Sequence, residues 1–310
     1  MAFDVRLFSG IGIFATIVET GNFTKAGAAI GLTSSGVSRA VSRLEQRLGV
    51  RLFDRSPKAV SLTPEGRAFH LRVIPLLDEA EAAAVDAGGL KVSLSGRLRI
   101  CADLPSAYLI LAPLLPSWQV LYPDLTVEIV VKEAMGDLVS EGFDAVVRFG
   151  ETEARGLNVH LLGHTRILTV ASPNFLAGKI KPSEPSDLNM NNCISMRDPL
   201  KMAPYLWKFI SKNKIVTSVP KSGLFINDGV TLKAACIAGC GIGQLLEIEV
   251  IHSIENGELV PLFPEWHEEY YPLYLYTLPG TVKSRRVNFF IEFLISKCSG
   301  VELKGFNGLG

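Results

Sequence analysis

The sequence has few of the features that mark secreted, membrane-spanning or metal-binding proteins. Only five of its 310 residues are cysteine, an odd number without a C-x-x-C pair, so neither a disulfide framework nor a zinc site is indicated. No apolar run approaches the roughly 20 residues that cross a bilayer. The N-terminus, MAFDVRLF, lacks the basic and apolar segments of a signal peptide. We therefore expect a cytoplasmic protein without a membrane partner.

Charge of either sign is not in excess, because 31 Lys and Arg residues balance 31 Asp and Glu residues. A protein that coats nucleic acid or a membrane usually carries a large net charge, so any charge that serves DNA binding must be local. Residues 1–66 hold eight basic and five acidic residues, a net charge of +3. The chain is long enough for two or three domains with separate cores.

Catalytic signatures are missing as well. The chain contains no G-x-S-x-G, P-loop, dinucleotide-binding or H-E-x-x-H motif. Its histidines, which do not cluster with a nucleophile, are His70, His160, His164, His252 and His267. We therefore predict that the protein is not an enzyme and has no catalytic residue, no metal site and no cofactor.

The first 48 residues predict three short helices. The first carries apolar residues at helical spacing and ends before Gly21. The second begins at Thr24, its expected N-cap, and ends at Ile30. The third, capped by Thr33, spans Ser34 to about Leu48 and is amphipathic. Its buried face is predicted to hold Val37, Val41, Leu44 and Leu48, and its opposite face Ser35, Ser38, Arg39 and Ser42.

A small β-hairpin is expected next. Two β-like runs, Arg51–Asp54 and Ala59–Leu62, flank the turn Arg55-Ser56-Pro57-Lys58, which has a cation at each end. Three helices followed by such a hairpin predict a winged helix-turn-helix in which the hairpin is the wing. We therefore expect a DNA-binding domain over residues 1–62.

A long helix is predicted after the wing. Thr63 provides its cap, and Pro64 stands in the first turn, where its missing N–H costs nothing. Small and apolar residues recur in steps of four and three, which is the period of a coiled-coil seam and requires a second chain. Pro75 should kink this helix, so a bent or two-part dimerisation helix is expected. The seam consists of Phe69, Val73, Leu76, Ala80, Ala83 and Ala87, and the helix ends at Gly88-Gly89.

From residue 96 onward strand-like and helix-like segments alternate, as in an α/β fold. Expected strands are Leu98–Ala102, Leu125–Val131, Ala145–Arg148, Arg166–Ala171, Cys193–Ser195, Gly223–Ile226, Gly241–Leu246 and Leu273–Tyr276. The expected parts are a linker helix and hinge (63–95), lobe I (about 96–166 and 271–297), lobe II (about 167–270) and a flexible tail (298–310).

Residues 14–66, FATIVETGNFTKAGAAIGLTSSGVSRAVSRLEQRLGVRLFDRSPKAVSLTPEG, resemble the signature of the LysR-type transcriptional regulators nearly end to end. The runs E-T-G-x-F-T, L-E-x-x-L-G-x-x-L-F-x-R and L-T-x-x-G occur at the family's spacing. Later segments such as LAPLLPSWQVLYPDLTVEI, INDGVTLKAACIAGCGIG and GELVPLFPEW resemble its effector domain, so the likeness covers roughly residues 5–297. Gly27 and Gly36 stand where the family commonly has alanine.

This resemblance implies that the third helix enters a major groove. Arg39 could then reach O6 and N7 of a guanine, and the serine hydroxyls could reach phosphates or base edges. The implied DNA-binding residues are Thr33, Ser34, Ser35, Ser38, Arg39, Ser42, and, on the wing, Arg55 and Lys58. The wing cations would contribute affinity more than sequence choice. Three further residues, Arg43, Arg47 and Arg51, fit DNA contact and plain surface charge equally well.

The resemblance also implies two α/β lobes of periplasmic-binding-protein type with a small-molecule effector between them. The implied ligand-binding residues are Asp103, Pro105, Ser106, Arg148, Phe149, Ser195, Asn227 and Gln244. Free N–H groups near Ser106 would favour an anion such as a carboxylate. Pro105 departs from the family, which usually has Ser or Thr there. As an alternative, Arg148 forms a structural ion pair with Asp144 or Glu141. Likewise, Asn227 and Asp228 could serve only as the cap of a helix.

Two cysteines, Cys236 and Cys240, lie four residues apart on a predicted helix. A redox sensor would need one of them as an exposed thiolate. The neighbours are small and apolar and include no cation, so core packing is the favoured interpretation.

The predicted protein is a LysR-type regulator that binds inverted-repeat promoter DNA as a dimer and, like the family, assembles further into a tetramer. RNA polymerase would be a partner of an activator. The alternative is an enzyme or a solute-binding module with an accessory DNA-binding domain. Effector identity, target operon and the sign of regulation are not encoded in propensity or spacing.

Overall fold

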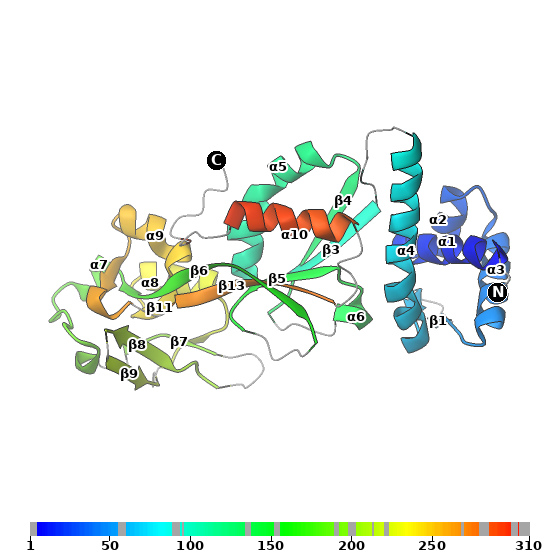
Figure 1. The fold of residues 1–310 in the computed structure, drawn as a ribbon. Coiled ribbons are helices and arrows are strands. Elements are labelled where there is room, and N and C mark those ends of the chain that lie inside the picture. Colours follow the sequence, from blue (N-terminus) through cyan, green and yellow to red (C-terminus); the bar gives the residue numbers. More distant parts are fainter. Residues whose placement is uncertain are drawn as a thin grey trace.

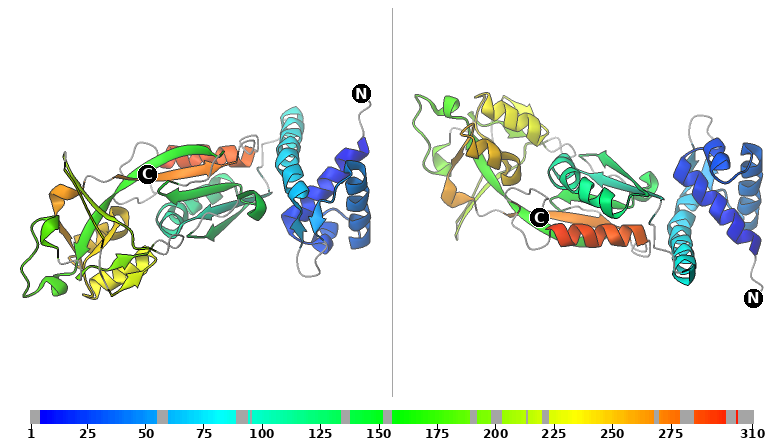
Figure 2. Two further views of the ribbon diagram at one scale, coloured as in Figure 1. Left: turned by 90° about the horizontal axis from the view of Figure 1, so that it is seen from below. Right: turned by 90° about the horizontal axis from the view of Figure 1, so that it is seen from above.

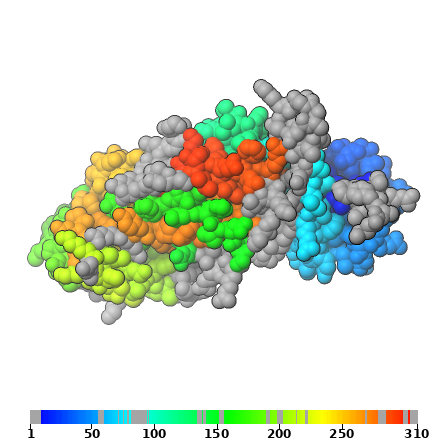
Figure 3. All heavy atoms as spheres, viewed as in Figure 1, coloured from blue at the N-terminus to red at the C-terminus, as the bar shows by residue number. Residues whose placement is uncertain are grey.

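The computed structural model describes residues 5–54, 60–88, 94, 96–133, 138–151, 156–188, 192–197, 203–212, 214–219, 223–267, 270–278, 285–298 and 303. The N-terminal helices form one end of an elongated molecule, helix α4 stands beside them, and two α/β lobes extend to the other end (Figure 1). Views from below and above keep this order (Figure 2), and the space-filling view has the same extended outline (Figure 3). Within these ranges no helix is both long and apolar enough to span a membrane.

Three helices make up the N-terminal domain: α1 (Val5–Thr20), α2 (Phe23–Ala29) and α3 (Ser34–Leu48). Phe14 and Ile17 of α1 are completely buried against Val37 of α3, so the predicted three-helix arrangement is confirmed. Gly27 is the point of closest approach between α2 and the turn that follows. A Cβ at this position would overlap the carbonyl oxygen of Leu32, which explains why alanine is absent here.

Side-chain caps begin two of these helices. Thr33 caps α3 as predicted, because its Oγ1 accepts the Gly36 N–H at 3.1 Å. The predicted cap of α2 at Thr24 is wrong. Asn22 occupies that role, and its Oδ1 accepts the N–H groups of Thr24 at 2.7 Å and Lys25 at 3.2 Å. The asparagine oxygen provides an acceptor for two of the N–H groups that have no partner within the helix. A threonine hydroxyl in the first turn of the helix could not provide this.

The base of the wing is a pair of short antiparallel strands, β1 (Phe53–Asp54) and β2 (Ser61–Leu62). Glu45 links them to α3, because its Oε1 accepts the N–H of Leu52 at 2.7 Å and of Phe53 at 3.2 Å. The predicted hairpin is confirmed at its base, with shorter strands than expected. Its turn, residues 55–59, lies outside the described residues.

Helix α4 (Pro64–Gly88) is one continuous helix. Thr63 caps it as predicted, since its Oγ1 accepts the Gly66 N–H at 2.9 Å. Of the predicted bent or two-part helix, the two-part form is wrong, because α4 runs through Pro75 without a break. Proline removes a single N–H donor, and the turns on either side of it in this 25-residue helix keep their own hydrogen bonds.

The predicted seam of α4 divides into two parts. Phe69 packs edge-on against Phe14 of α1, with ring centroids 5.3 Å apart, and Val73 is 5% exposed. This first part is therefore buried within the chain itself. Leu76 is 52% exposed and Ala80 is exposed, so only the later part remains open for another chain. The side chains of Ala83 and Ala87 lie outside the described residues.

The strands of lobe I are β4 (Leu125–Val131), β3 (Gly96–Ala102), β5 (Ala145–Phe149) and β13 (Tyr270–Thr277), in that spatial order. They continue into β6 (Asn158–Ala171), which also pairs with β11 (Gly243–Leu246) and β12 (Val260–Leu262), so the whole sheet has seven strands. Strand β3 runs parallel to β4 and β5, whereas β13 is antiparallel to β5. Val287, Phe290 and Leu294 of the last helix pack into the same core as Leu98 and Trp118. The elements of lobe I are β3 (Gly96–Ala102), η1 (Ser106–Leu111), α5 (Ala112–Leu121), β4 (Leu125–Val131), α6 (Leu138–Glu141), β5 (Ala145–Phe149), β13 (Tyr270–Thr277) and α10 (Arg285–Cys298).

Strand β6 (Asn158–Ala171) belongs to both lobes. Its first part, Asn158–Arg166, pairs with β13, and its last part, Ile167–Ala171, pairs with β11 (Gly243–Leu246) and β12 (Val260–Leu262). Only the last six residues were expected from the sequence. Among the eight earlier residues the apolar Val159 and Leu161 are 54% and 58% exposed, so the usual pattern of buried apolar and exposed polar residues is absent there.

Lobe II contains a β-hairpin and a helix that the sequence analysis missed. The hairpin strands are β8 (Trp207–Ser211) and β9 (Lys214–Ser218), and the helix is α9 (Glu247–Glu255). Helix α9 is rich in Ile and Val, which favour strands, so its local signal was weak. The other elements are α7 (Pro173–Leu176), η2 (Pro185–Asp187), β7 (Ser195–Met196), β10 (Phe225–Ile226), α8 (Gly229–Ile237) and η4 (Pro264–Trp266).

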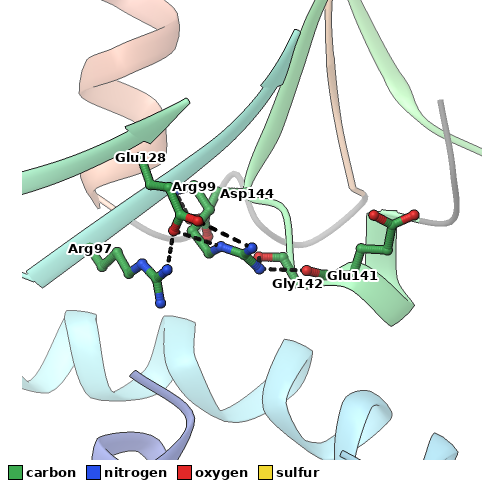
Figure 4. Close-up of polar contacts among 6 residues, drawn as sticks. All are labelled: Arg97, Arg99, Glu128, Glu141, Gly142 and Asp144. Atoms are coloured by element: carbon green, nitrogen blue, oxygen red, sulfur yellow. Dashed lines mark hydrogen bonds and ion pairs between the residues drawn. The ribbon is translucent and has the colours of Figure 1, made fainter. Parts of the chain in front are cut away.

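Lobe I faces α4 through a network of charged residues (Figure 4). Arg97 and Arg99 of β3 share the carboxylate of Glu128 on β4, and Arg99 Nη1 also donates to the Glu141 carbonyl at 2.5 Å. The Arg99 N–H donates to Asp144 at 2.8 Å. A cavity of about 910 Å³ lies between this network and the N-terminal domain, and it is lined by α1, α4, the base of the wing and lobe I.

Gly66 tests the contact between α4 and the wing. A Cβ at this position would overlap the carbonyl of Leu52, so Gly66→Ala should destabilise the N-terminal domain by about 1–3 kcal/mol. The control is Gly12→Ala in the interior of α1, where a Cβ meets nothing within 4 Å and alanine should stabilise by about 1 kcal/mol. Urea unfolding followed by circular dichroism measures both, and equal stabilities would contradict the contact.

Candidate functional site

Helix α3 divides into a buried and a polar face as predicted. Val37, Val41 and Leu44 are at most 4% exposed, whereas Leu48 lies at the margin and is half-buried. The exposed residues of the polar face are Ser34, Ser35, Ser38, Arg39 and Ser42, with the capping Thr33 beside them. The helix lies at the end of the molecule away from the lobes (Figure 1). This placement leaves the whole polar face open to a large ligand.

Arg39 is oriented along α3 by its own helix. Its Nε donates to the Ser35 carbonyl at 3.3 Å, and the Ser35 hydroxyl lies 3.1 Å from that of Thr33. Within the described ranges the two terminal nitrogens of Arg39 make no hydrogen bond, so they can donate to an outside acceptor such as a guanine edge. The wing cations Arg55 and Lys58 lie outside the described residues, and all the DNA contacts stay predictions.

Asp103 organises the lobe I side of the predicted effector site. It is 7% exposed, and its two carboxylate oxygens accept the N–H groups of Ser106 at 3.0 Å and Phe149 at 2.8 Å. Burial is the main cause that raises the pKa of this carboxyl. The expectation of a free N–H at Ser106 is wrong, because Asp103 itself takes the position of an anion there. Pro105 precedes the helix η1 and has no N–H to offer.

Arg148 reaches toward the same group of residues from β5. Its Nη2 donates to the Glu133 carbonyl at 3.4 Å. In the described part of the chain it forms no ion pair with Asp144 or Glu141, so that alternative is wrong. Glu141 pairs with Lys132 instead. Asp103, Ser106, Arg148 and Phe149 are therefore brought together where β3 and β5 end.

The lobe II residues of the predicted site are more dispersed. Asp228 is the cap of α8, because its Oδ1 accepts the Thr231 N–H at 2.8 Å, and Asn227 beside it is exposed. The capping interpretation is thus confirmed for Asp228. Ser195 is completely buried on β7. Gln244 is bonded inside lobe II, since its Nε2 donates to Thr169 Oγ1 at 3.3 Å and to the Lys208 carbonyl at 3.2 Å.

Two residues between the lobes were missed by the sequence analysis. Glu249 of α9 is 8% exposed. Burial, and to a smaller extent the charges of Asp103 and Asp228, raises its pKa to about 7. Tyr108 of η1 lies beside this carboxyl, and burial followed by the charge of Glu249 raises the pKa of its hydroxyl. Glu249 lies within a helix that the sequence did not predict, so no local signal marked it.

The cysteines differ in their surroundings. Cys236 is completely buried, and burial raises the pKa of its thiol to about 12, so the core interpretation is confirmed for this residue. Cys240 is exposed, contrary to the core interpretation, because it lies beyond the end of α8. Among the described residues no group of His, Cys, Asp or Glu is arranged to hold a metal ion.

In the comparison with known proteins, two family descriptions match separate parts of the chain. The family description "LysR substrate binding domain" matches residues 91–299, and "Bacterial regulatory helix-turn-helix protein, lysR family" matches residues 8–67. A putative transcriptional regulator of Pseudomonas aeruginosa is 34% identical over 85% of this chain and 86% of its own length. The HTH-type transcriptional regulator CrgA of Neisseria meningitidis is 28% identical over 92% of this chain and 95% of its own. The structure of CrgA covers 94% of this chain and 99% of its own, with 27% identity and a TM-score of 0.61.

The raised pKa of Glu249 predicts a pH dependence of stability. Its ionised form is disfavoured in the folded protein. Below its ordinary pKa of 4.5 the carboxyl is protonated in both states and does not lower the free energy of unfolding, whereas between pH 4.5 and about 7 it lowers that free energy increasingly. Glu249→Gln should flatten the fall in melting temperature between pH 4.5 and 7 and melt higher than the wild type at pH 8.

The control for this measurement is Glu258→Gln, which changes an exposed carboxyl of the same lobe. It should leave the pH profile of the melting temperature unchanged. Parallel profiles for the wild type and Glu249→Gln would contradict the penalty assigned to Glu249.

Proposed function

The chain belongs to the LysR-type transcriptional regulators, and on that premise we propose that it binds inverted-repeat promoter DNA as a dimer through α3. The observation that carries the proposal is the exposed face of α3, where Ser35, Ser38 and Arg39 lie opposite a completely buried Val37. In this geometry the apolar face of the helix packs against the domain core, and its polar face can contact a major groove. Phosphate contacts from the wing would add affinity and salt dependence.

The proposed dimer forms through the later part of α4. Leu76 is a large apolar residue with half of its surface exposed, and Ala80 follows one turn later on the same side. A two-fold pairing of these helices would present two copies of α3, which is why the DNA site should have dyad symmetry. Assembly of two dimers into a tetramer, and contact with RNA polymerase if the protein activates transcription, are further parts of the proposal.

The two lobes respond to a small-molecule effector, as the family assignment of residues 91–299 indicates. We place the effector where β3 and β5 of lobe I approach α8 and α9 of lobe II. The carboxylate suggested by the sequence loses its main support, because the Ser106 N–H already donates to Asp103. We propose that the protein works in the cytoplasm as a regulator and not as an enzyme.

Arg39→Ala tests the role of α3. Loss of a bidentate contact to guanine should weaken binding to the specific site by about 5- to 150-fold. Arg72→Ala removes an exposed arginine of α4 from the same N-terminal half of the chain and should change affinity only slightly. Electrophoretic shifts with an inverted-repeat promoter fragment measure both. Equal losses for the two variants would show that Arg39 contributes charge and no recognition.

Leu76→Glu tests the proposed dimer. A carboxylate in an apolar seam loses hydration and repels its symmetry mate, so dimers should dissociate at concentrations where the wild type stays paired. Sedimentation velocity gives the oligomeric state, and Arg72→Ala again serves as the control. A Leu76→Glu protein with wild-type assembly would place the dimer contact elsewhere.

A further inference from the structure

Carboxyl groups from both lobes converge where the lobes meet. Asp103 follows β3 and Glu133 follows β4 in lobe I, while Asp228 precedes α8 and Glu249 lies in α9 of lobe II. Burial is the largest cause that raises the pKa of Asp103, Glu133 and Glu249. The charge of Asp103 further raises the pKa of both Glu133 and Glu249, so these carboxyls interact across the boundary between the lobes.

Each lobe has a helix start suited to bind an anion, and one of the chain's own carboxylates already lies at each of them. In lobe I the N–H groups of Ser106 and Phe149 donate to Asp103. In lobe II the Glu249 carboxyl lies so close to Gly229, the first residue of α8, that a Cβ there would overlap it. Backbone N–H groups at a helix start are the usual binding place for an anionic ligand. An incoming carboxylate would therefore meet the chain's own carboxylates.

The neighbouring cations do not balance these carboxyls. Arg148 Nη2 donates to the backbone carbonyl of Glu133, and Lys233 Nζ donates to that of Glu249 at 3.2 Å. Both cations lower the pKa of a nearby carboxyl, but among the described residues there are only two such cations beside four carboxyls. Tyr108 supplies no charge, because its raised pKa keeps the hydroxyl protonated. Within the described residues, negative charge therefore exceeds positive charge between the lobes.

A buried hydroxyl at the same place lacks a well-oriented partner. Ser106 is completely buried, and in the described part of the chain its Oγ lies beside the Asp103 carboxyl without the geometry of a good hydrogen bond. The Tyr108 hydroxyl, on the same helix, lies against the Glu249 carboxyl, which contributes to its raised pKa. Burial without a good hydrogen bond is costly, so the Ser106 hydroxyl is expected to gain a polar ligand as its partner.

We infer that the effector carries a positively charged ammonium or amidinium group, which binds among Asp103, Glu133 and Glu249. The inference rests on the proposed function and names the class of its effector. A cation would neutralise the excess carboxylates and allow the two lobes to stay closed. A proton is the other source of positive charge, and the experiment separates the two.

The test compares ligands that differ only in charge. Benzylammonium, benzyl alcohol and benzoate form one series, and butylammonium, butanol and butyrate form another. The full-length protein is melted at pH 8 with each of them. An ammonium compound should raise the melting temperature by about 2–4 °C at roughly tenfold its dissociation constant, and its alcohol and acid should not. An equal or larger shift with a carboxylate overturns the inference, as does the absence of a shift with both ammonium compounds.

Variants and pH locate the effect. Glu249→Gln should weaken ammonium binding at least tenfold, whereas Glu258→Gln in the same lobe should bind as the wild type does. The ammonium shift should shrink at pH 5.5, where Glu249 is protonated. Stabilisation by acid alone, with no ammonium effect at pH 8, would identify the proton as the ligand and overturn the cationic effector.

DNA binding provides an independent readout. If the inference fails and the proposed function holds, the protein still shifts an inverted-repeat promoter fragment in an Arg39-dependent manner. If the wild type fails to shift such DNA, the proposed function itself is wrong, whatever the melting temperatures show.

Discussion

Strand β6 is shared by two lobes, and the regulatory half of the molecule depends on this sharing. It pairs with β13 before Arg166 and with β11 and β12 after it, and β13 begins opposite Arg166. The chain therefore passes between the lobes at one place, on two adjacent antiparallel strands. Relative motion of the lobes is confined to this strand pair, because sliding would break both hydrogen-bonded ladders.

An ion pair stiffens this crossing point. Arg166 donates two hydrogen bonds, of 2.9 and 2.8 Å, to Glu247, which is 5% exposed. The bidentate geometry fixes the start of α9 against the strand. Glu249 lies two residues further along this helix, so its carboxyl is held at a defined place relative to Arg166 of β6. A small rotation at Arg166 is thereby converted into a change in distance between Glu249 and Asp103.

The N-terminal domain could be predicted in detail from the sequence because its signals are local. The bounds of α3, the cap at Thr33 and the cap at Thr63 follow from residues within four positions of one another. Where two local signals compete, prediction fails. At α2 the stronger acceptor, Asn22, displaced the expected cap, and at Pro75 the local penalty was too small to end a long helix.

The effector site could be predicted only in part, since its chemistry depends on contacts between distant segments. The sequence located Asp103, Ser106, Arg148 and Phe149 near strand ends, and they do lie together. It could not show that Asp103 accepts the N–H of Phe149, 46 residues away, or that Glu249 approaches Gly229. These contacts determine which donors remain open, and local spacing carries no information about them.

The close approach of Gly66 to Leu52 affects the spacing between the two wings of a dimer on DNA. Because α4 starts directly against the backbone that leads into the wing, the wing cannot turn independently of that helix. In a dimer joined along α4, the distance between the two wings along the duplex is then set by the angle between the two helices. Any signal that changes the helix crossing angle must change the length of DNA that the pair can span.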